Sequence, residues 1–220
     1  MARQLRLNLG RDAPASLDEF VRGPSNADAV AAIEAWPAWL GGCLALVGPQ
    51  GSGKSHLARA WAELAGARRI EAAAADADAA SGAPVLVEDA DRSPCAEGLF
   101  HLINIAAREG GGLLLTARTR PRAWPTDLPD LRSRLNALPV TEIQAPDDAV
   151  LEGVLRRFFR NRLIRPPEQV YPYLLARMNR SIPDAEEIVR ALDEAGDAGF
   201  RPVTRVLARQ ILDRRSRQVP

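Results

Sequence analysis

The stretch Gly48-Pro49-Gln50-Gly51-Ser52-Gly53-Lys54-Ser55 has the spacing G-x-x-x-x-G-K-S, in which x is any residue. Glycines at the fixed positions let the backbone wrap closely around phosphate oxygens, while lysine and a small hydroxyl complete the pattern. Lys54 is the only lysine in a chain whose other basic side chains are all arginine. A compact ammonium group enters such a cradle where a planar guanidinium does not. The stretch therefore predicts a phosphate-binding loop.

The segments on either side of this loop suit the same role. Cys43–Val47, directly before it, is a short apolar run that predicts a buried strand. Leu57, Trp61 and Leu64 follow at the spacing of one helix face, so we expect a helix to begin at the loop. The N-terminus of a helix presents unpaired N–H groups and the positive end of its dipole to phosphate.

Each fixed residue type in the motif then has a chemical task. The backbone N–H groups of Gly51 and Gly53 can approach the phosphates closely. Lys54 would reach the β- and γ-phosphates, and the Ser55 hydroxyl would hold Mg²⁺. We therefore expect ADP or ATP, together with Mg²⁺, as the cofactors of this chain.

The rest of the chain predicts an α/β fold. Short apolar runs alternate with helical stripes as far as residue 145, which indicates a parallel sheet covered on both faces. After Pro146 only helical stripes appear, so residues 11–145 are expected to form the core and residues 146–220 an all-helical lid. Residues 72–80 are rich in Ala and Asp, and their pattern does not choose between helix and loop. The expected strands are 43–47, 69–71, 85–87, 113–116 and 140–143.

Composition narrows the function further. The net charge is +1, which does not indicate a chain that wraps DNA by charge alone. The chain has two cysteines and two histidines without the spacing of a zinc site. No apolar run approaches the length of a membrane span, and residues 1–10 do not resemble a signal peptide. We therefore expect a cytoplasmic protein without a membrane partner.

A P-loop core followed by a helical lid resembles the AAA+ ATPases, and two further motifs resemble their DnaA branch. Phe20–Asn26 is similar to the F-V-x-G-x-S-N segment that lines the adenine pocket in that branch, and Leu131–Leu135 is similar to its box with the arginine finger. The nucleotide contacts implied by the loop and the resemblance are Val21, Gly23, Asn26, Gly48, Gln50, Gly51, Ser52, Gly53, Lys54, Ser55, His56, Thr116 and Arg180.

The N-terminus resembles a clamp-binding peptide. Gln4, Leu5, Leu7 and Leu9 match the Q-L-x-L-x-L pattern that binds the replication sliding clamp. With the P-loop core and lid, this pattern is similar to the Hda group of DnaA-family regulators. The resemblance implies DnaA and the β sliding clamp of DNA polymerase III as partners, with DNA contacted mainly through the clamp and a homodimer possible. By itself, alternating leucine would more commonly indicate an edge strand of the chain's own fold.

The acids after the third expected strand differ from the family pattern. Walker B carries an aspartate that holds Mg²⁺ and then an acid that activates water, and here the pair is Glu88 and Asp89. The first acid is one methylene longer and the second is shorter than a glutamate. Water activation tolerates little misplacement, so we expect nucleotide binding with weak intrinsic hydrolysis. Thr116 ends the fourth strand at the position that the resemblance gives to the polar sensor residue, and an ordinary threonine at a strand end is the alternative.

Two arginine assignments stay open at this level. Asp184 stands where the lid of the family carries an arginine for the γ-phosphate, and Arg180, one turn earlier, could compensate for it. If Arg180 does not, ADP would be held about as well as ATP. The resemblance selects Arg134 as the finger that promotes hydrolysis on DnaA, whereas helical periodicity does not separate it from Arg132.

Three functions remain compatible with these patterns. The first is a clamp-tethered regulator that stimulates hydrolysis of DnaA-bound ATP, with Arg134 and Asp89 as the catalytic candidates. The second is an adaptor that recruits the initiator without stimulating hydrolysis. The third is a small-molecule P-loop kinase, which leaves the N-terminal peptide without a role.

Overall fold

The computed structural model describes residues 16–75, 82–92, 95–107, 111–199 and 202–216. The predicted clamp peptide, with Gln4, Leu5, Leu7 and Leu9, lies outside these residues, as does most of the ambiguous segment 72–80. The part of that segment that is described forms a short 3₁₀ turn, η2 (Ala72–Ala74).

Five parallel strands form the centre of the core in the order β2-β3-β4-β1-β5. After β1 the chain crosses to β2 at one edge and returns through β3 and β4, before β5 adds on the other side of β1. Ligands of open parallel sheets bind at the carboxyl ends of the strands where the order reverses in this way. The strands are β1 (Cys43–Val47), β2 (Arg68–Glu71), β3 (Val85–Glu88), β4 (Leu113–Ala117) and β5 (Val140–Glu142).

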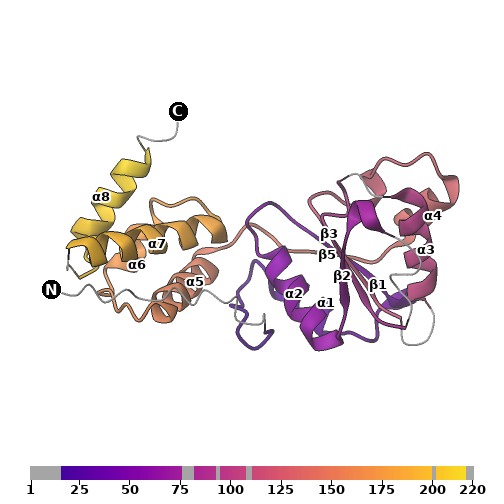
Figure 1. Ribbon diagram of the computed structural model, residues 1–220, viewed down its shortest axis with the longest axis horizontal. Helices are drawn as coiled ribbons and strands as arrows, with labels where there is room; N and C mark the ends of the chain where they lie inside the picture. The colour runs from indigo at the N-terminus through magenta and orange to yellow at the C-terminus, as the bar shows by residue number, and fades with distance from the viewer. Residues whose placement is uncertain (1–15, 76–81, 93–94, 108–110, 200–201, 217–220) are drawn as a thin grey trace.

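Helices cover both faces of this sheet (Figure 1). Alternate residues of a strand face opposite sides, so Leu44 and Leu46 pack on the face of α1 and α2, whereas Cys43, Ala45 and Val47 pack on the face of α3 and α4. Both layers exclude water, which explains why β1 reads as a continuous apolar run. The core helices are α1 (Ala27–Glu34), α2 (Lys54–Ala65), α3 (Ala96–Ala106) and α4 (Pro129–Ala137).

The chain after Pro146 is helical, as predicted. Its helices are α5 (Asp148–Asn161), α6 (Val170–Leu175), α7 (Ile182–Gly199) and α8 (Arg205–Ser216), and their apolar faces share one hydrophobic cluster. Asp147 caps α5 by accepting a hydrogen bond from the Val150 N–H at 2.9 Å, a contact that contributes about 1 kcal/mol. We call residues 146–220 the lid; its outer limits stay a prediction.

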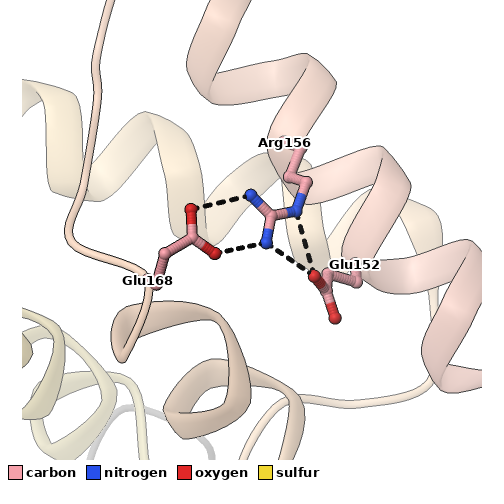
Figure 2. Close-up of polar contacts among 3 residues, drawn as sticks. All are labelled: Glu152, Arg156 and Glu168. Atoms are coloured by element: carbon pink, nitrogen blue, oxygen red, sulfur yellow. Dashed lines mark hydrogen bonds and ion pairs between the residues drawn. The ribbon is translucent and has the colours of Figure 1, made fainter.

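An ion-pair network joins α5 to the start of α6 (Figure 2). The Arg156 guanidinium donates to both Glu152, one turn earlier on α5, and Glu168, before α6. The same group lies 4.1 Å from the centre of the Tyr171 ring. Arg156 therefore links the two lid helices through charge and ring contact together. Each helix in the described residues is too short or too polar to cross a bilayer.

Candidate nucleotide-binding site

The P-loop follows β1 and needs glycine at three positions. A Cβ on Gly48 would lie 2.3 Å from the carbonyl oxygen of Ile143, so only glycine lets the loop pass β5. Gly51 and Gly53 have φ angles of 77° and 99°, a region that side chains disfavour. The Gly48 N–H donates to Ala117 O at 3.2 Å, which attaches the loop to the end of β4. The predicted strand, loop and helix order is therefore present.

Lys54 lies at the first position of α2 with its side chain folded back over the loop. Nζ donates to the carbonyl oxygens of Gly48 at 2.7 Å and Pro49 at 2.8 Å. Burial lowers the pKa of Lys54, with the nearby charge of Asp89 acting in the opposite direction. The ammonium group is thus held beside the loop by weak neutral acceptors, which a phosphate would outcompete by charge.

The remaining loop residues divide into two groups. Ser52 is buried, and its hydroxyl donates to Pro49 O at 2.9 Å, so it shapes the turn from inside. Gln50 and Ser55 are exposed on the outer side. The exposed hydroxyl of Ser55 remains a predicted ligand of Mg²⁺, and it is a hard oxygen donor of the kind that this ion prefers.

The two acids after β3 are held differently. Both carboxylate oxygens of Glu88 accept hydrogen bonds from Arg59, on α2. Asp89 has a φ angle of 50°, and its N–H donates to the Thr116 hydroxyl at 3.0 Å. Its carboxylate is 3.6 Å from Arg92. The structure thus brings Glu88, Asp89 and Thr116 to one end of the sheet, and Glu88 offers carboxylate oxygens, which also suit Mg²⁺ in kind.

Asp91 was missed by the sequence reasoning. Its Oδ2 accepts hydrogen bonds from the N–H groups of Arg118 and Thr119 at 2.9 and 3.1 Å, and from the Thr119 hydroxyl. Its Oδ1 is buried and has no hydrogen-bond partner among the described residues. Asp91 therefore fixes the loop after β4, which begins next to Gly48. Its position two residues after Asp89 was the available signal.

The segment Phe20–Asn26 is shaped by the buried amide of Asn26. Its Nδ2 donates to Val21 O at 2.9 Å, and its Oδ1 accepts from the Gly23 N–H at 2.9 Å. Ser25 continues the link, because its N–H donates to Oδ2 of Asp147 at 2.8 Å. Asn26 therefore organises the predicted adenine pocket through the backbone, and the segment joins core to lid.

His56 lies where that segment, α2 and the lid meet. Its ring stacks on Phe20 with 5.8 Å between ring centres. Nη1 of Arg157, on α5, is 3.3 Å from Nε2 of His56 and donates to Glu19 O at 2.9 Å. Burial, followed by the positive charges of Arg157 and Arg59, lowers the pKa of His56. Arg157 was not identified from sequence.

The start of α7 lies directly on the P-loop. The Ile182 N–H donates to Gly51 O at 3.0 Å, and a Cβ on Gly51 would lie 2.5 Å from the Ser181 hydroxyl oxygen. Arg180, however, donates to Pro146 O and pairs with Asp148 at 2.9 Å. In this structure the guanidinium of Arg180 contacts the beginning of the lid. Its contact with nucleotide stays a prediction.

Asp184, which the resemblance to the AAA+ ATPases aligns with a lid arginine, has partners within the lid. One oxygen accepts from the Asn179 N–H at 2.8 Å, and the other pairs with Arg215, on α8, at 2.6 Å. Its carboxylate therefore stabilises the turn before α7. This role explains an acid here without reference to phosphate.

The two arginines of the predicted finger motif differ in their contacts. Arg132 is half-buried, and its guanidinium donates to Arg122 O at 3.0 Å and Trp124 O at 2.8 Å. Arg134, two residues further along α4, is exposed. Tertiary contacts thus give Arg132 a structural role and leave Arg134 as the arginine of this motif that faces solvent.

Comparisons with known proteins match this architecture. No family model and no curated protein matches the chain. Domain III of the replication initiation protein DnaA from Thermotoga maritima is 17% identical and covers 91% of this chain and 96% of its own, with a TM-score of 0.74. AMPPCP-bound DnaA from Aquifex aeolicus is 19% identical and covers 84% of this chain and 67% of its own, with a TM-score of 0.64.

A RuvB variant from Thermotoga maritima is also similar, with 15% identity and a TM-score of 0.71 over 91% of this chain and 72% of its own. The predicted fold class is confirmed. The chain has an α/β fold similar to those of DnaA domain III and RuvB, with five parallel strands, flanking helices and a helical C-terminal segment.

Proposed function

We propose that this chain binds ADP or ATP at Gly48–Ser55 and regulates replication initiation by acting on DnaA. The P-loop geometry supports the first part, because positive φ angles at Gly51 and Gly53 turn the loop around the start of α2. A DnaA structure of the same fold is bound to the nucleotide analogue AMPPCP. Mg²⁺ would be held by Ser55 and Glu88, and it would offset phosphate charge when bound.

Residues of the chain itself then carry the remaining tasks. Lys54 would exchange its two carbonyl contacts for phosphate oxygens. His56 and Phe20 would close the side of the nucleotide site that is next to the lid. Asp89, whose backbone Thr116 holds, is the acid that would orient a water. Its aspartate length and its pairing with Arg92 support weak hydrolysis of the chain's own nucleotide.

The exposed position of Arg134 carries the regulatory part of the proposal. An arginine that enters the site of a partner stabilises charge on the transferring phosphoryl group and accelerates hydrolysis by about 10³ to 10⁵ in comparable enzymes. Such a residue has to be accessible and supported by a rigid helix, and Arg134 on α4 meets both conditions. We propose that it acts on ATP bound to DnaA, while residues 1–10 tether the chain to the sliding clamp.

The test measures hydrolysis of radiolabelled ATP prebound to DnaA in the presence of clamp-loaded DNA. We expect stimulation by the wild-type chain, loss of stimulation in Arg134→Ala, and retention in Arg209→Ala, which removes an exposed arginine from α8. Stimulation that survives in Arg134→Ala would reject the finger. No stimulation by the wild type would favour an adaptor that recruits DnaA.

The clamp tether has a separate test. A variant with Gln4, Leu7 and Leu9 changed to alanine should lose retention on clamp-loaded DNA while its circular dichroism spectrum stays unchanged. Retention of that variant on the DNA would reject the proposed clamp peptide but would not contradict the proposed nucleotide site. A gel-filtration mass measurement on the same samples decides whether the chain is a homodimer.

A further inference from the structure

Arg59 and Glu88 form a two-pronged ion pair beside the candidate nucleotide site. Nε of Arg59 donates to Oε1 of Glu88 at 3.0 Å, and Nη2 donates to Oε2 at 3.2 Å. One planar guanidinium therefore occupies both oxygens of the carboxylate that is the predicted metal ligand. Bidentate pairs of this kind are stronger and more directional than single contacts.

The position of Arg59 on α2 explains what this pair does to the site. Ser55 and Arg59 are four residues apart, so they lie on the same helix face about 6 Å apart along the axis. The residue that holds the Glu88 carboxylate therefore lies one turn after Ser55 on α2. The longer side chain of a glutamate reaches Arg59. The glutamate at this position, where the family pattern has aspartate, therefore forms an ion pair with α2.

The surroundings of the pair keep it reversible. The side chains of Arg59 and Glu88 retain 46% and 27% of their exposure, so water competes for both charges. An open pocket of about 620 Å³ lies beside Glu88 and admits solvent. Arg69, Asp89 and Arg92 are among the residues that line it with Glu88. A carboxylate held in this way remains available to a divalent cation, which prefers the same oxygens.

We propose that Arg59 competes with Mg²⁺ for the carboxylate of Glu88, so that Mg²⁺ loading of a bound nucleotide requires this ion pair to open. The inference rests on the nucleotide-binding part of the proposed function. While the pair is closed, Arg59 also neutralises a carboxylate that would otherwise repel phosphates. The closed pair thus favours binding of nucleotide without metal, and Arg59 acts as a positioning residue through Glu88.

The test measures the affinity of a fluorescent ATP analogue across a Mg²⁺ titration that starts in EDTA. The variants are Arg59→Gln, Arg59→Lys, Glu88→Gln and the double variant Arg59→Gln with Glu88→Gln. Arg69→Gln is the matched control, because it removes one positive charge from the pocket beside Glu88, and no hydrogen bond or ion pair joins Arg69 to Glu88 among the described residues. Thermal denaturation of each variant confirms folding.

We expect Arg59→Gln to lower the Mg²⁺ concentration at half-effect by about two- to fivefold, the range that an exposed ion pair supports. Arg59→Lys should give a smaller shift, and Arg69→Gln should differ from Arg59→Gln by showing little change. In the Glu88→Gln background, Arg59→Gln should have no further effect.

An unchanged or raised Mg²⁺ midpoint in Arg59→Gln overturns the competition while leaving nucleotide binding intact. An equal shift in Arg69→Gln also overturns it, since general charge would then account for the effect. A wild-type chain that binds no nucleotide with or without Mg²⁺ rejects the proposed nucleotide site, and this inference with it.

Discussion

The N–H of Ile182 donates a hydrogen bond to the carbonyl oxygen of Gly51 at 3.0 Å. This contact joins the first residue of lid helix α7 to the phosphate-binding loop. The two residues are 131 positions apart in the sequence, and the local pattern around neither of them predicts the contact. Ser181 and Ile182 also lie against the spaces where side chains on Gly51 and Gly53 would be. The lid and the loop therefore constrain each other, and we expect a substitution in one to alter the conformation of the other.

Gly51→Ala should weaken both folding and nucleotide binding. Alanine would have to adopt the positive φ angle of this position, which side chains disfavour. Its Cβ would also lie 2.5 Å from the Ser181 hydroxyl oxygen. We expect a loss of about 2–4 kcal/mol in the free energy of unfolding, from backbone strain and overpacking together, and at least about tenfold weaker nucleotide binding.

Gly66→Ala is the matched control for this substitution. Gly66 has a φ angle of 63° and nothing within 4 Å of a new Cβ, so only the backbone strain of about 1 kcal/mol applies. Urea denaturation measures both variants. Equal losses in the two would show that contact with the lid contributes nothing at Gly51.

Lys54 should lose its proton at a lower pH in the folded chain than in the unfolded chain. Burial lowers its pKa, and an ordinary lysine titrates near a pKa of about 10.4. Because the unfolded state then binds more protons between these two values, stability gains a contribution as pH rises through that window. The chain has one lysine, so an amine-reactive reagent reports this side chain in a single tryptic peptide by mass spectrometry.

The labelling midpoint of Lys54 should lie below that of the same lysine in urea-denatured chain. Comparison of midpoints, and not of rates, separates protonation from accessibility. ATP should protect the folded chain from labelling, because a phosphate would occupy the ammonium group. Coincident midpoints in folded and denatured chain would contradict the effect of burial.

Arg132→Ala and Arg134→Ala should differ in their effect on the free energy of unfolding. Removal of Arg132 leaves two backbone carbonyls without their donor, so we expect a loss of about 1–2 kcal/mol in the free energy of unfolding. Removal of exposed Arg134 should change that energy by less than about 0.5 kcal/mol. Thermal denaturation distinguishes them, and a larger loss in Arg134→Ala would show that Arg134 is structural.

Stability should rise with pH through the titration of His56. Its pKa is lowered by burial and by two arginines, so between the folded-state pKa and the ordinary value near 6.5 only the unfolded state binds the proton. The contribution is complete above about pH 6.5 and is lost as pH falls to the folded-state pKa. The measurement is urea denaturation between pH 5 and pH 8.

His56→Gln should flatten this part of the pH profile. His101→Gln is the control, because His101 is the other histidine of the chain and lies exposed on α3. Carboxylates contribute the same slope to all three proteins, so the difference between the variants isolates His56. A profile that both substitutions leave unchanged would contradict the lowered pKa.

Local sequence determined the P-loop, the strands and the helix faces of this protein. A run such as Cys43–Val47 is buried by two helical layers at once, so its apolar pattern is visible without the partners. Glycines at Gly48, Gly51 and Gly53 are likewise required by backbone space and angle within a few residues of chain. The fold class could therefore be predicted, because it depends on short-range periodicity.

Only the tertiary structure decided how the charged side chains are used. Arg132 and Arg134 flank the leucine stripe of α4 at similar angles on opposite sides, and only the contacts of Arg132 with the carbonyls of the preceding loop distinguish them. Arg59 meets Glu88 from a different element, as Arg157 meets His56. A long flexible side chain takes its partner from whatever the packed fold brings within reach, and sequence spacing carries no record of that choice.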